Sequence, residues 1–235
     1  MCEIYGFCGN RAVTLNQYTN EFWTHARIHK DGFGYYLADR KLLYVNPQSA
    51  MDYIKGLNKF DFKSKLALCH IRFKTHGPAK TENCHPFIKK DVLEIEWSLI
   101  HNGYINDTPT TAALGTIQKG ETDSERILLC IVETVNRFYE HSFIEDHAEY
   151  LNSLYRAIES TCNELSTLGK VNIIFTDNFT NNMYVYMNHR NTLFKHISDD
   201  GVHISTTPLT KEFRCWSAVE PGKLHVFNNG TLINY

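Results

Sequence analysis

Residues 2–9, CEIYGFCG, predict a short buried strand that begins at the second residue of the chain. The stretch is rich in apolar and aromatic side chains, as strands are, and it ends at the turn-forming pair Gly9-Asn10. Cys2 therefore stands at the start of a strand. A cysteine there can be an ordinary small apolar residue of the core. It can also become the first residue of a processed chain.

Strand patterns precede and follow a helical middle section. Residues 122–125 predict a helix start, in which Thr122 caps free amides and Glu125 reaches back toward it. A second helix is expected over about 145–168, and Asn46-Pro47 is expected to open a short one. Further strands are predicted for GYYLAD (34–39), KLLYV (41–45), KLALCHIRF (65–73), LEIEWSLIHNG (93–103), KVNIIFTD (170–177), NMYVYMN (182–188), HISTTP (203–208) and LHVFNNGTLINY (224–235). This order favours an α+β layered fold, and one domain over residues 1–235 is expected because no linker or repeat divides the chain.

The composition is that of an ordinary globular protein, with 43% of the 235 residues hydrophobic and 21% charged. A net charge of −2 provides no basic surface, which argues against nucleic acid or an anionic membrane as a partner. No apolar run approaches the roughly 20 residues that span a bilayer, and no leader sequence precedes Cys2. Seven cysteines without a CxxC pair favour a reduced, cytoplasmic protein. The sequence is silent on the oligomeric state.

Cys2 carries the first chemical signal. Removal of Met1, which cells favour when the second residue is small, would leave Cys2 with both a thiol and a free α-amine. An α-amine has a pKa of about 7.7–8.0, so part of it is unprotonated near neutral pH and can accept the thiol proton. One residue could then supply both the nucleophile and the general base.

Asn102-Gly103 carries the second signal, at the end of a predicted strand. An acyl transfer needs hydrogen-bond donors directed at the developing oxyanion, and an asparagine side chain with a neighbouring backbone N–H can supply two of them. The alternative interpretation is that this Asn-Gly pair forms only a tight hairpin turn.

Two charged positions suit the ends of an amino-acid substrate. Arg72 follows a predicted buried strand together with Thr75, His76 and Gly77, a setting that favours bidentate binding of an α-carboxylate. The alternative for Arg72 is a surface ion pair. Asp123 could bind an α-ammonium group, or it could simply complement the positive end of the helix that begins beside it.

Six sequence blocks occur in order between residue 2 and about residue 130. They are MCEIYGF, HKDGFG, HIRFKTHG, ENCHPF, WSLIHNG and GETDSE. Together they resemble the glutaminase domain of the class II glutamine amidotransferases, and ISTTPL at 204–209 matches the C-terminal pattern more loosely. HKDGFG and ENCHPF are similar to the short stand-alone members. Phe73-Lys74 departs from the Trp-Ala that fused members often carry, so the side chains at the mouth of the site differ.

The resemblance implies the four-layer αββα sandwich of the N-terminal-nucleophile hydrolases. It also implies that Cys2 is the nucleophile, with its own α-amine as the base. Asn102 and Gly103 are implied to form the oxyanion hole. The implied reaction is cleavage of the γ-amide of glutamine or of another γ-glutamyl compound, and neither a cofactor nor a metal is implied.

The resemblance further assigns the residues that would hold the substrate. Arg72, helped by Thr75 and His76, is implied to bind the α-carboxylate. Asp123 is implied to bind the α-amine. His85-Pro86-Phe87 and residues 31–34 match family motifs that we interpret as structural.

Several functions remain open at this point. In one, the chain is a hydrolase, and water cleaves a γ-glutamyl thioester on Cys2. In another, the chain is a glutaminase subunit that delivers ammonia to a partner synthetase chain. No nucleotide-binding GxxxxGK[ST] or GxGxxG motif indicates an attached synthetase. A third reading is a non-catalytic γ-glutamyl-binding module. A zinc site built on Cys69-His70 and Cys84-His85 is disfavoured, because adjacent residues of a strand point to opposite faces.

Overall fold

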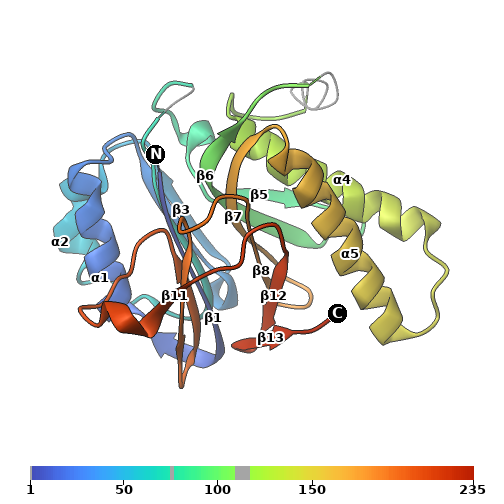
Figure 1. Cartoon of the computed structure of the whole chain (residues 1–235). Coiled ribbons are helices and arrows are strands. Elements are labelled where there is room, and N and C mark those ends of the chain that lie inside the picture. Colours follow the sequence, from blue (N-terminus) through green and yellow to red (C-terminus); the bar gives the residue numbers. More distant parts are fainter. Residues whose placement is uncertain (1, 75–76, 109–116) are drawn as a thin grey trace.

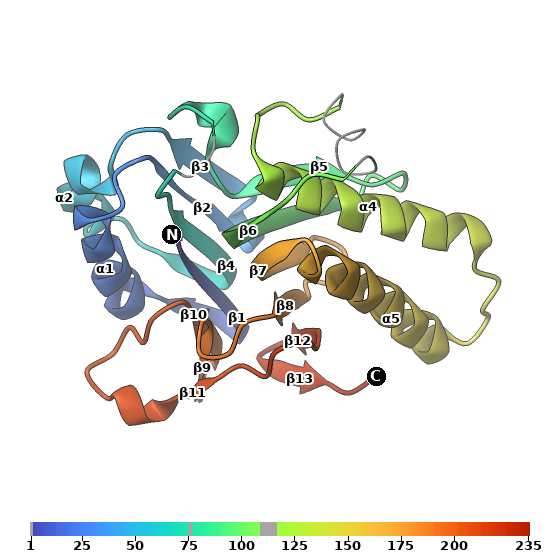
Figure 2. The same ribbon diagram turned by 45° about the horizontal axis from the view of Figure 1, so that its top comes forward.

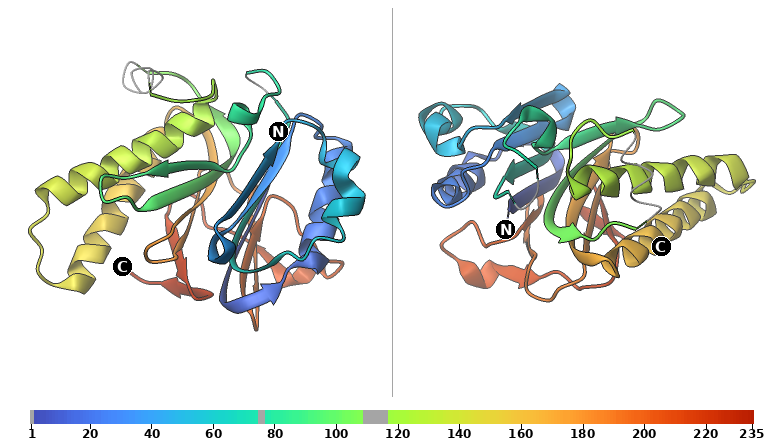
Figure 3. Two further views of the ribbon diagram at one scale, coloured as in Figure 1. Left: turned by 180° about the vertical axis from the view of Figure 1, so that it is seen from behind. Right: turned by 90° about the horizontal axis from the view of Figure 1, so that it is seen from above.

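Two antiparallel sheets lie face to face between two layers of helices (Figure 1). The computed structural model describes residues 2–74, 77–108 and 117–235. Helices α1 and α2 cover the outer face of one sheet, and α4 and α5 cover the outer face of the other, as the views from behind and from above also show (Figure 3). The predicted α+β fold with four αββα layers is therefore confirmed.

The seven-stranded sheet has the order β11-β9-β10-β1-β4-β2-β3. Its strands are β1 (Glu3–Thr14), β2 (Phe33–Leu37), β3 (Leu42–Asn46), β4 (Lys63–Ile71), β9 (Phe194–Ser198), β10 (Gly201–Ser205) and β11 (Trp216–Ala218). The six-stranded sheet has the order β13-β12-β8-β7-β6-β5. Its strands are β5 (Phe87–Lys90), β6 (Glu96–Ile105), β7 (Gly169–Asp177), β8 (Met183–Met187), β12 (His225–Asn228) and β13 (Thr231–Ile233).

The helical layers are unequal in size. The helices are α1 (Asn16–Thr24), α2 (Ile54–Leu57), α4 (Asp123–His141) and α5 (His147–Ser166), and short 3-10 segments cover His25–Arg27, Ala38–Arg40, Ala50–Tyr53, Thr81–Asn83 and Phe213–Cys215. The long helices α4 and α5 run side by side (Figure 2). Within the described residues, no helix combines the length and apolar character needed to cross a membrane.

Strand β1 lies at the centre of the fold because both of its faces are buried. Successive side chains of a strand point to opposite faces of the sheet. Tyr5 and Phe7 accordingly pack in the cluster beneath α1, whereas Ile4 and Cys8 pack between the two sheets. A strand with two buried faces reads as a continuous apolar run, which is why residues 2–9 predicted it.

The prediction that Asn102-Gly103 ends a strand in a turn is wrong. Both residues lie inside β6, where Asn102 pairs with Asn172 and Gly103 pairs with Val171 of β7. A Cβ atom on Gly103 would overlap the backbone carbonyl oxygen of Lys170, so glycine permits the close approach of β6 and β7. The pairing partner overrides the local turn preference of the dipeptide.

The structure confirms one predicted helix start and contradicts another. Asn46-Pro47 does not open a helix: the Asn46 side chain accepts a hydrogen bond from Gln48 N at 2.9 Å, and the 3-10 turn begins only at Ala50. Thr122 does cap α4, since its hydroxyl accepts from Glu125 N at 3.4 Å. Strands β5, β9 and β11 were not predicted, because each is short and its burial follows no clear alternation.

The buried Glu125 carboxylate binds the loop that precedes α4. It accepts hydrogen bonds from Lys119 N at 2.8 Å and from Gly120 N at 2.7 Å. It thereby fixes the backbone of the loop that leads into Asp123, the first residue of α4. The side chain of Glu125 thus fixes the loop rather than completing the reciprocal cap.

Replacing Glu125 by alanine should leave two backbone amides without an acceptor. We expect the Glu125→Ala variant to lose about 1–3 kcal/mol of unfolding free energy, measured by urea denaturation. Glu140→Ala, an exposed change on the same helix, is the control and should alter stability by less than about 0.5 kcal/mol. Equal effects of the two variants would contradict the role given to Glu125.

Candidate active site

Cys2 lies directly before β1, beside the chain that leaves β4. Glu3 pairs with Ile71, so the residue before β1 faces the residues that follow β4. The Phe73 backbone flanks the thiol: Phe73 N donates to Cys2 Sγ at 3.4 Å, and Sγ lies 3.5 Å from Phe73 O. The pairing of two sheet strands therefore fixes the position of the cysteine sulfur.

The thiol of Cys2 is not activated by its surroundings alone. Burial raises its pKa, while the hydrogen bond from the Phe73 backbone and the nearby charge of Arg72 lower it less strongly. Asp123 adds a small upward effect on the pKa. The sulfur is therefore protonated near neutral pH, and a nucleophilic role would require a nearby base.

Asn102 reaches from the second sheet to Cys2. Its side-chain nitrogen Nδ2 donates a hydrogen bond to the backbone carbonyl of Cys2, and its Oδ1 accepts from Asn172 Nδ2 at 2.8 Å. An amide nitrogen carries two hydrogens, and within the described residues only the bond to Cys2 uses one of them. The second hydrogen can serve an oxygen atom that is placed beside the sulfur.

Arg72 follows β4 and is buried next to Phe73. Its guanidinium donates to the carbonyls of Asp31, Gly77 and Pro78 at 3.2–3.4 Å. These are long contacts to neutral acceptors, and they hold a positive charge in place beside the cysteine. Thr75 and His76, which sequence reasoning grouped with Arg72, lie outside the described residues.

Asp123 begins α4 and binds back to the end of β6. Its Oδ2 accepts a hydrogen bond from Ile105 N at 2.8 Å, two residues beyond Gly103. A cavity of about 150 Å³ opens beside this carboxylate and is lined also by Tyr104 and Arg126. Arg72 and Asp123 both act on the Cys2 thiol, and Asn102, which precedes Gly103, binds the Cys2 carbonyl, so the predicted site residues that the structure describes lie near one another.

Three buried histidines lie near this site. Sequence reasoning named His70 and His85 only in a disfavoured zinc site and a structural motif, and it missed His101. The rings of His70 and His85 lie 3.9 Å apart, and His70 Nε2 lies 3.2 Å from the carbonyl oxygen of His101. His101 Nδ1 in turn lies 2.9 Å from Ser124 Oγ on α4. Burial lowers the pKa of all three, so they are neutral at pH 7.

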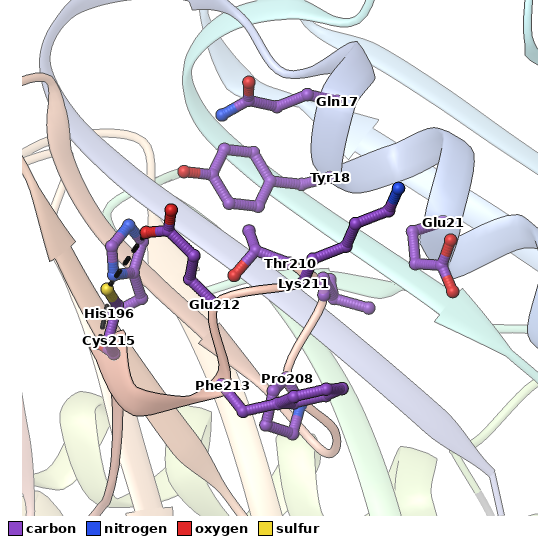
Figure 4. A pocket seen from close by; sticks show the side chains of 11 residues that line it. Gln17, Tyr18, Glu21, His196, Pro208, Thr210, Lys211, Glu212, Phe213 and Cys215 are labelled. Atoms are coloured by element: carbon purple, nitrogen blue, oxygen red, sulfur yellow. Dashed lines mark hydrogen bonds between the residues drawn. The ribbon is translucent and has the colours of Figure 1, made fainter.

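A cavity of about 720 Å³ lies elsewhere in the structure (Figure 4). It lies between α1 and residues 208–215, where Tyr18, Glu212 and His196 face one another, and none of the predicted site residues lines it. Among the described residues, no three histidine, cysteine or acidic side chains gather closely enough to hold a metal ion. Cys69 and His70 indeed face opposite sides of their strand, toward α1 and toward His101.

Residues 1–197 match the family described as class II glutamine amidotransferases. The chain belongs to this family. A Haemophilus influenzae protein, itself assigned by inference as a glutamine amidotransferase, is 26% identical over 261 residues, which cover 99% of this chain and 86% of that protein. The recognition made from the six sequence blocks is therefore confirmed.

Solved structures of other amidotransferases have the same fold. Glutamine phosphoribosylpyrophosphate amidotransferase from B. subtilis matches with a TM-score of 0.66 at 18% identity, over 99% of this chain and 48% of that one. The present chain thus spans about half the length of that enzyme. A class II domain protein from Silicibacter pomeroyi matches with a TM-score of 0.61 at 17% identity, over 99% of this chain and 96% of that one.

The buried histidines should make this class II amidotransferase sensitive to acid. In the unfolded chain each histidine gains a proton near pH 6.5, whereas burial keeps the folded His70, His85 and His101 neutral at that pH. The unfolded state therefore binds more protons below this pH, and unfolding becomes easier. Lowering the pH from 7 to about 5.5 should cost about 1 kcal/mol of unfolding free energy for each of His70 and His85, whose pKa burial holds well below the usual range.

The measurement is urea denaturation at the two pH values. His85→Phe should reduce the loss between them by about 1 kcal/mol, since it removes one of these groups. His147→Asn, a change at an exposed histidine of α5, is the control and should leave the loss unchanged. An unaltered pH dependence in His85→Phe would contradict the prediction.

Proposed function

We propose that this chain is a hydrolase that cleaves the γ-amide of glutamine or of another γ-glutamyl compound through a thioester on Cys2. The observation that carries the proposal is the hydrogen bond from Asn102 Nδ2 to the Cys2 carbonyl, because it places an amide donor against the residue that carries the sulfur. We further propose that residues 1–235 form one such domain, with Met1 removed in the active protein.

The first half of the reaction forms the thioester. The α-amine of Cys2 accepts the thiol proton, and the sulfur attacks the γ-carbonyl carbon of the substrate. Negative charge develops on the carbonyl oxygen, where the second N–H of Asn102 and the backbone N–H of Gly103 stabilise it. The C–N bond then breaks, and the protonated amine returns its proton to the departing ammonia or amine.

The second half uses water. The α-amine takes a proton from water as the water oxygen attacks the thioester carbonyl carbon. The C–S bond then breaks, glutamate leaves, and the protonated amine returns its proton to the sulfur, which restores the thiol. The raised pKa of Cys2 supports the need for such a base in both halves, since the buried sulfur does not ionise readily by itself.

The substrate would be held by its two charged ends. We assign the α-carboxylate to Arg72, with Thr75 and His76 as further donors, and the α-ammonium group to Asp123. The effects of Arg72 and Asp123 on the Cys2 pKa support this assignment, because both charges act at the sulfur. All seven cysteines, each within the described residues, are free thiols, which supports action in the reducing cytoplasm.

A second candidate is a glutaminase subunit that passes ammonia to a separate synthetase chain. It is favoured by the similarity to the B. subtilis amidotransferase, whose chain is about twice as long as this one. Glutamate release by the purified chain alone at a steady rate would support the hydrolase. Release that accelerates strongly with a partner chain would support the subunit, and tight binding of glutamine without turnover would indicate a binding module.

Replacing Cys2 by alanine should abolish glutamate release from glutamine and γ-glutamyl dipeptides, because no other group is assigned as the nucleophile. The variant should stay folded, since one small residue replaces another at the start of β1. Cys215→Ala, at an exposed cysteine far along the chain, is the control and should keep wild-type turnover. Substantial turnover in Cys2→Ala would eliminate the proposed nucleophile.

Replacing Asn102 by alanine should slow acylation about a hundredfold or more, as the loss of other oxyanion donors does. Single-turnover measurements of leaving-group release would isolate this step. A rate close to that of the wild type would mean that Asn102 serves only the pairing of β6 with β7.

A further inference from the structure

Asn172 lies behind Asn102 on the neighbouring strand. The two asparagines are direct partners in the β6–β7 register, and Asn172 is completely buried. Its Nδ2 donates to Asn102 Oδ1 at 2.8 Å, and its Oδ1 lies 3.0 Å from Thr192 Oγ1. A continuous row of side chains thus runs from Thr192 through Asn172 and Asn102 to the Cys2 backbone.

The acceptor at one end of this row, the carbonyl oxygen of Cys2, sets the direction of the hydrogen bonds that both asparagines make. The carbonyl oxygen of Cys2 can only accept, so Asn102 must turn its Nδ2 toward it. The Oδ1 of Asn102 then points to β7, where it needs a donor, and Asn172 supplies one with its own Nδ2. If either amide were reversed, two oxygens or two NH₂ groups would face each other in a buried place.

We propose that Asn172 is a positioning residue for the acylation step, which it serves by holding the Asn102 amide with its N–H groups toward Cys2. The proposal rests on the proposed function, in which the second N–H of Asn102 stabilises the oxyanion. Asn172 does not touch the substrate. It keeps Asn102 from rotating by half a turn, which would bring an oxygen rather than a donor to the developing negative charge.

Thr192 secures the far end of the row less firmly. Its hydroxyl has a single hydrogen and lies within reach of two acceptors, His189 O at 2.6 Å and Asn172 Oδ1 at 3.0 Å. The bond to Asn172 is therefore shared, and its removal should matter less than removal of Asn172 itself. This gives an order of effects along the row: Asn102, then Asn172, then Thr192.

The test compares variants of Asn172 in the processed enzyme, with glutamine or the best γ-glutamyl substrate. Asn172→Ala leaves Asn102 Oδ1 without its donor, and kcat should fall about tenfold, a part of the 10²–10³-fold loss expected for the oxyanion donor itself. KM should stay within about twofold, because the groups assigned to substrate binding are unchanged. Thr192→Val should lower kcat about two- to fivefold, as loss of one shared hydrogen bond would.

Asn172→Asp gives a sharper readout. An ionised carboxylate only accepts hydrogen bonds, so it would draw Asn102 Nδ2 away from Cys2, and kcat at pH 8 should fall below that of Asn172→Ala. A protonated carboxyl can donate to Asn102 Oδ1 as asparagine does. The ratio of Asn172→Asp to wild-type kcat should therefore rise as the pH is lowered from 8 to about 6, whereas the ratio for Asn172→Ala stays flat.

A matched control lies on the same two strands. Ser98 Oγ and Thr176 Oγ1 form a buried cross-strand hydrogen bond at 2.6 Å, four residues along β6 from Asn102. Thr176→Val removes this bond and should lower stability without changing kcat. If Asn172→Ala behaves like Thr176→Val, with wild-type kcat and reduced stability, the positioning role is overturned.

The outcomes separate this proposal from the proposed function. If the wild type turns over, Asn102→Ala is slow and Asn172→Ala is normal, only the role of Asn172 falls. If the wild type releases no glutamate from any substrate, both proposals fall. If the Asn172 variants do not fold, Thr192→Val decides, and a wild-type kcat in that variant would overturn the positioning role.

Discussion

The hydrogen bond from Asn102 to the Cys2 carbonyl joins the two sheets at the one place where the assigned chemistry needs them joined. Cys2 stands at the start of β1 in one sheet, and Asn102 lies inside β6 in the other. Neither residue could reach the other unless the sheets were stacked face to face in this register. The apolar cluster between the sheets, which includes Ile4, Ile100 and Ile174, holds them in this arrangement. The geometry of the site therefore depends on the stacking of the two sheets.

The electrostatics around this contact favour neutral groups and a few fixed charges. The Cys2 residue is half-buried and the three nearby histidines are buried, and loss of solvent shifts the pKa of each group toward its uncharged form. Arg72 and Asp123 are the charged side chains that act on the sulfur, and backbone groups hold both in place. Surrounding charge alone does not ionise the Cys2 thiol, so the proposed reaction needs the α-amine of the same residue as its base.

Much of the framework could be predicted from local sequence. The apolar runs at 2–9 and 65–73 indicate β1 and β4 because those strands are buried on both faces, and the Thr122 cap marks the start of α4. The prediction of a turn at Asn102-Gly103 failed because pairing with β7 outweighs the preference of the Asn-Gly dipeptide for a turn. Asn172 and His101 stayed hidden for a related reason. Each lies in an ordinary strand or loop pattern, and only the register of distant segments gives it a partner. Thr75 and His76 remain predictions, since they lie outside the described residues.

The central claim is that the mature chain begins with a cysteine that attacks a γ-glutamyl group with the help of its own amine. Mass spectrometry of the N-terminal peptide from protein acid-quenched during turnover tests this most directly. The account predicts a peptide that starts at Cys2, lacks Met1 and carries a γ-glutamyl group on its sulfur. A turning-over enzyme that retains Met1, or one whose acyl group sits on another residue, would contradict it.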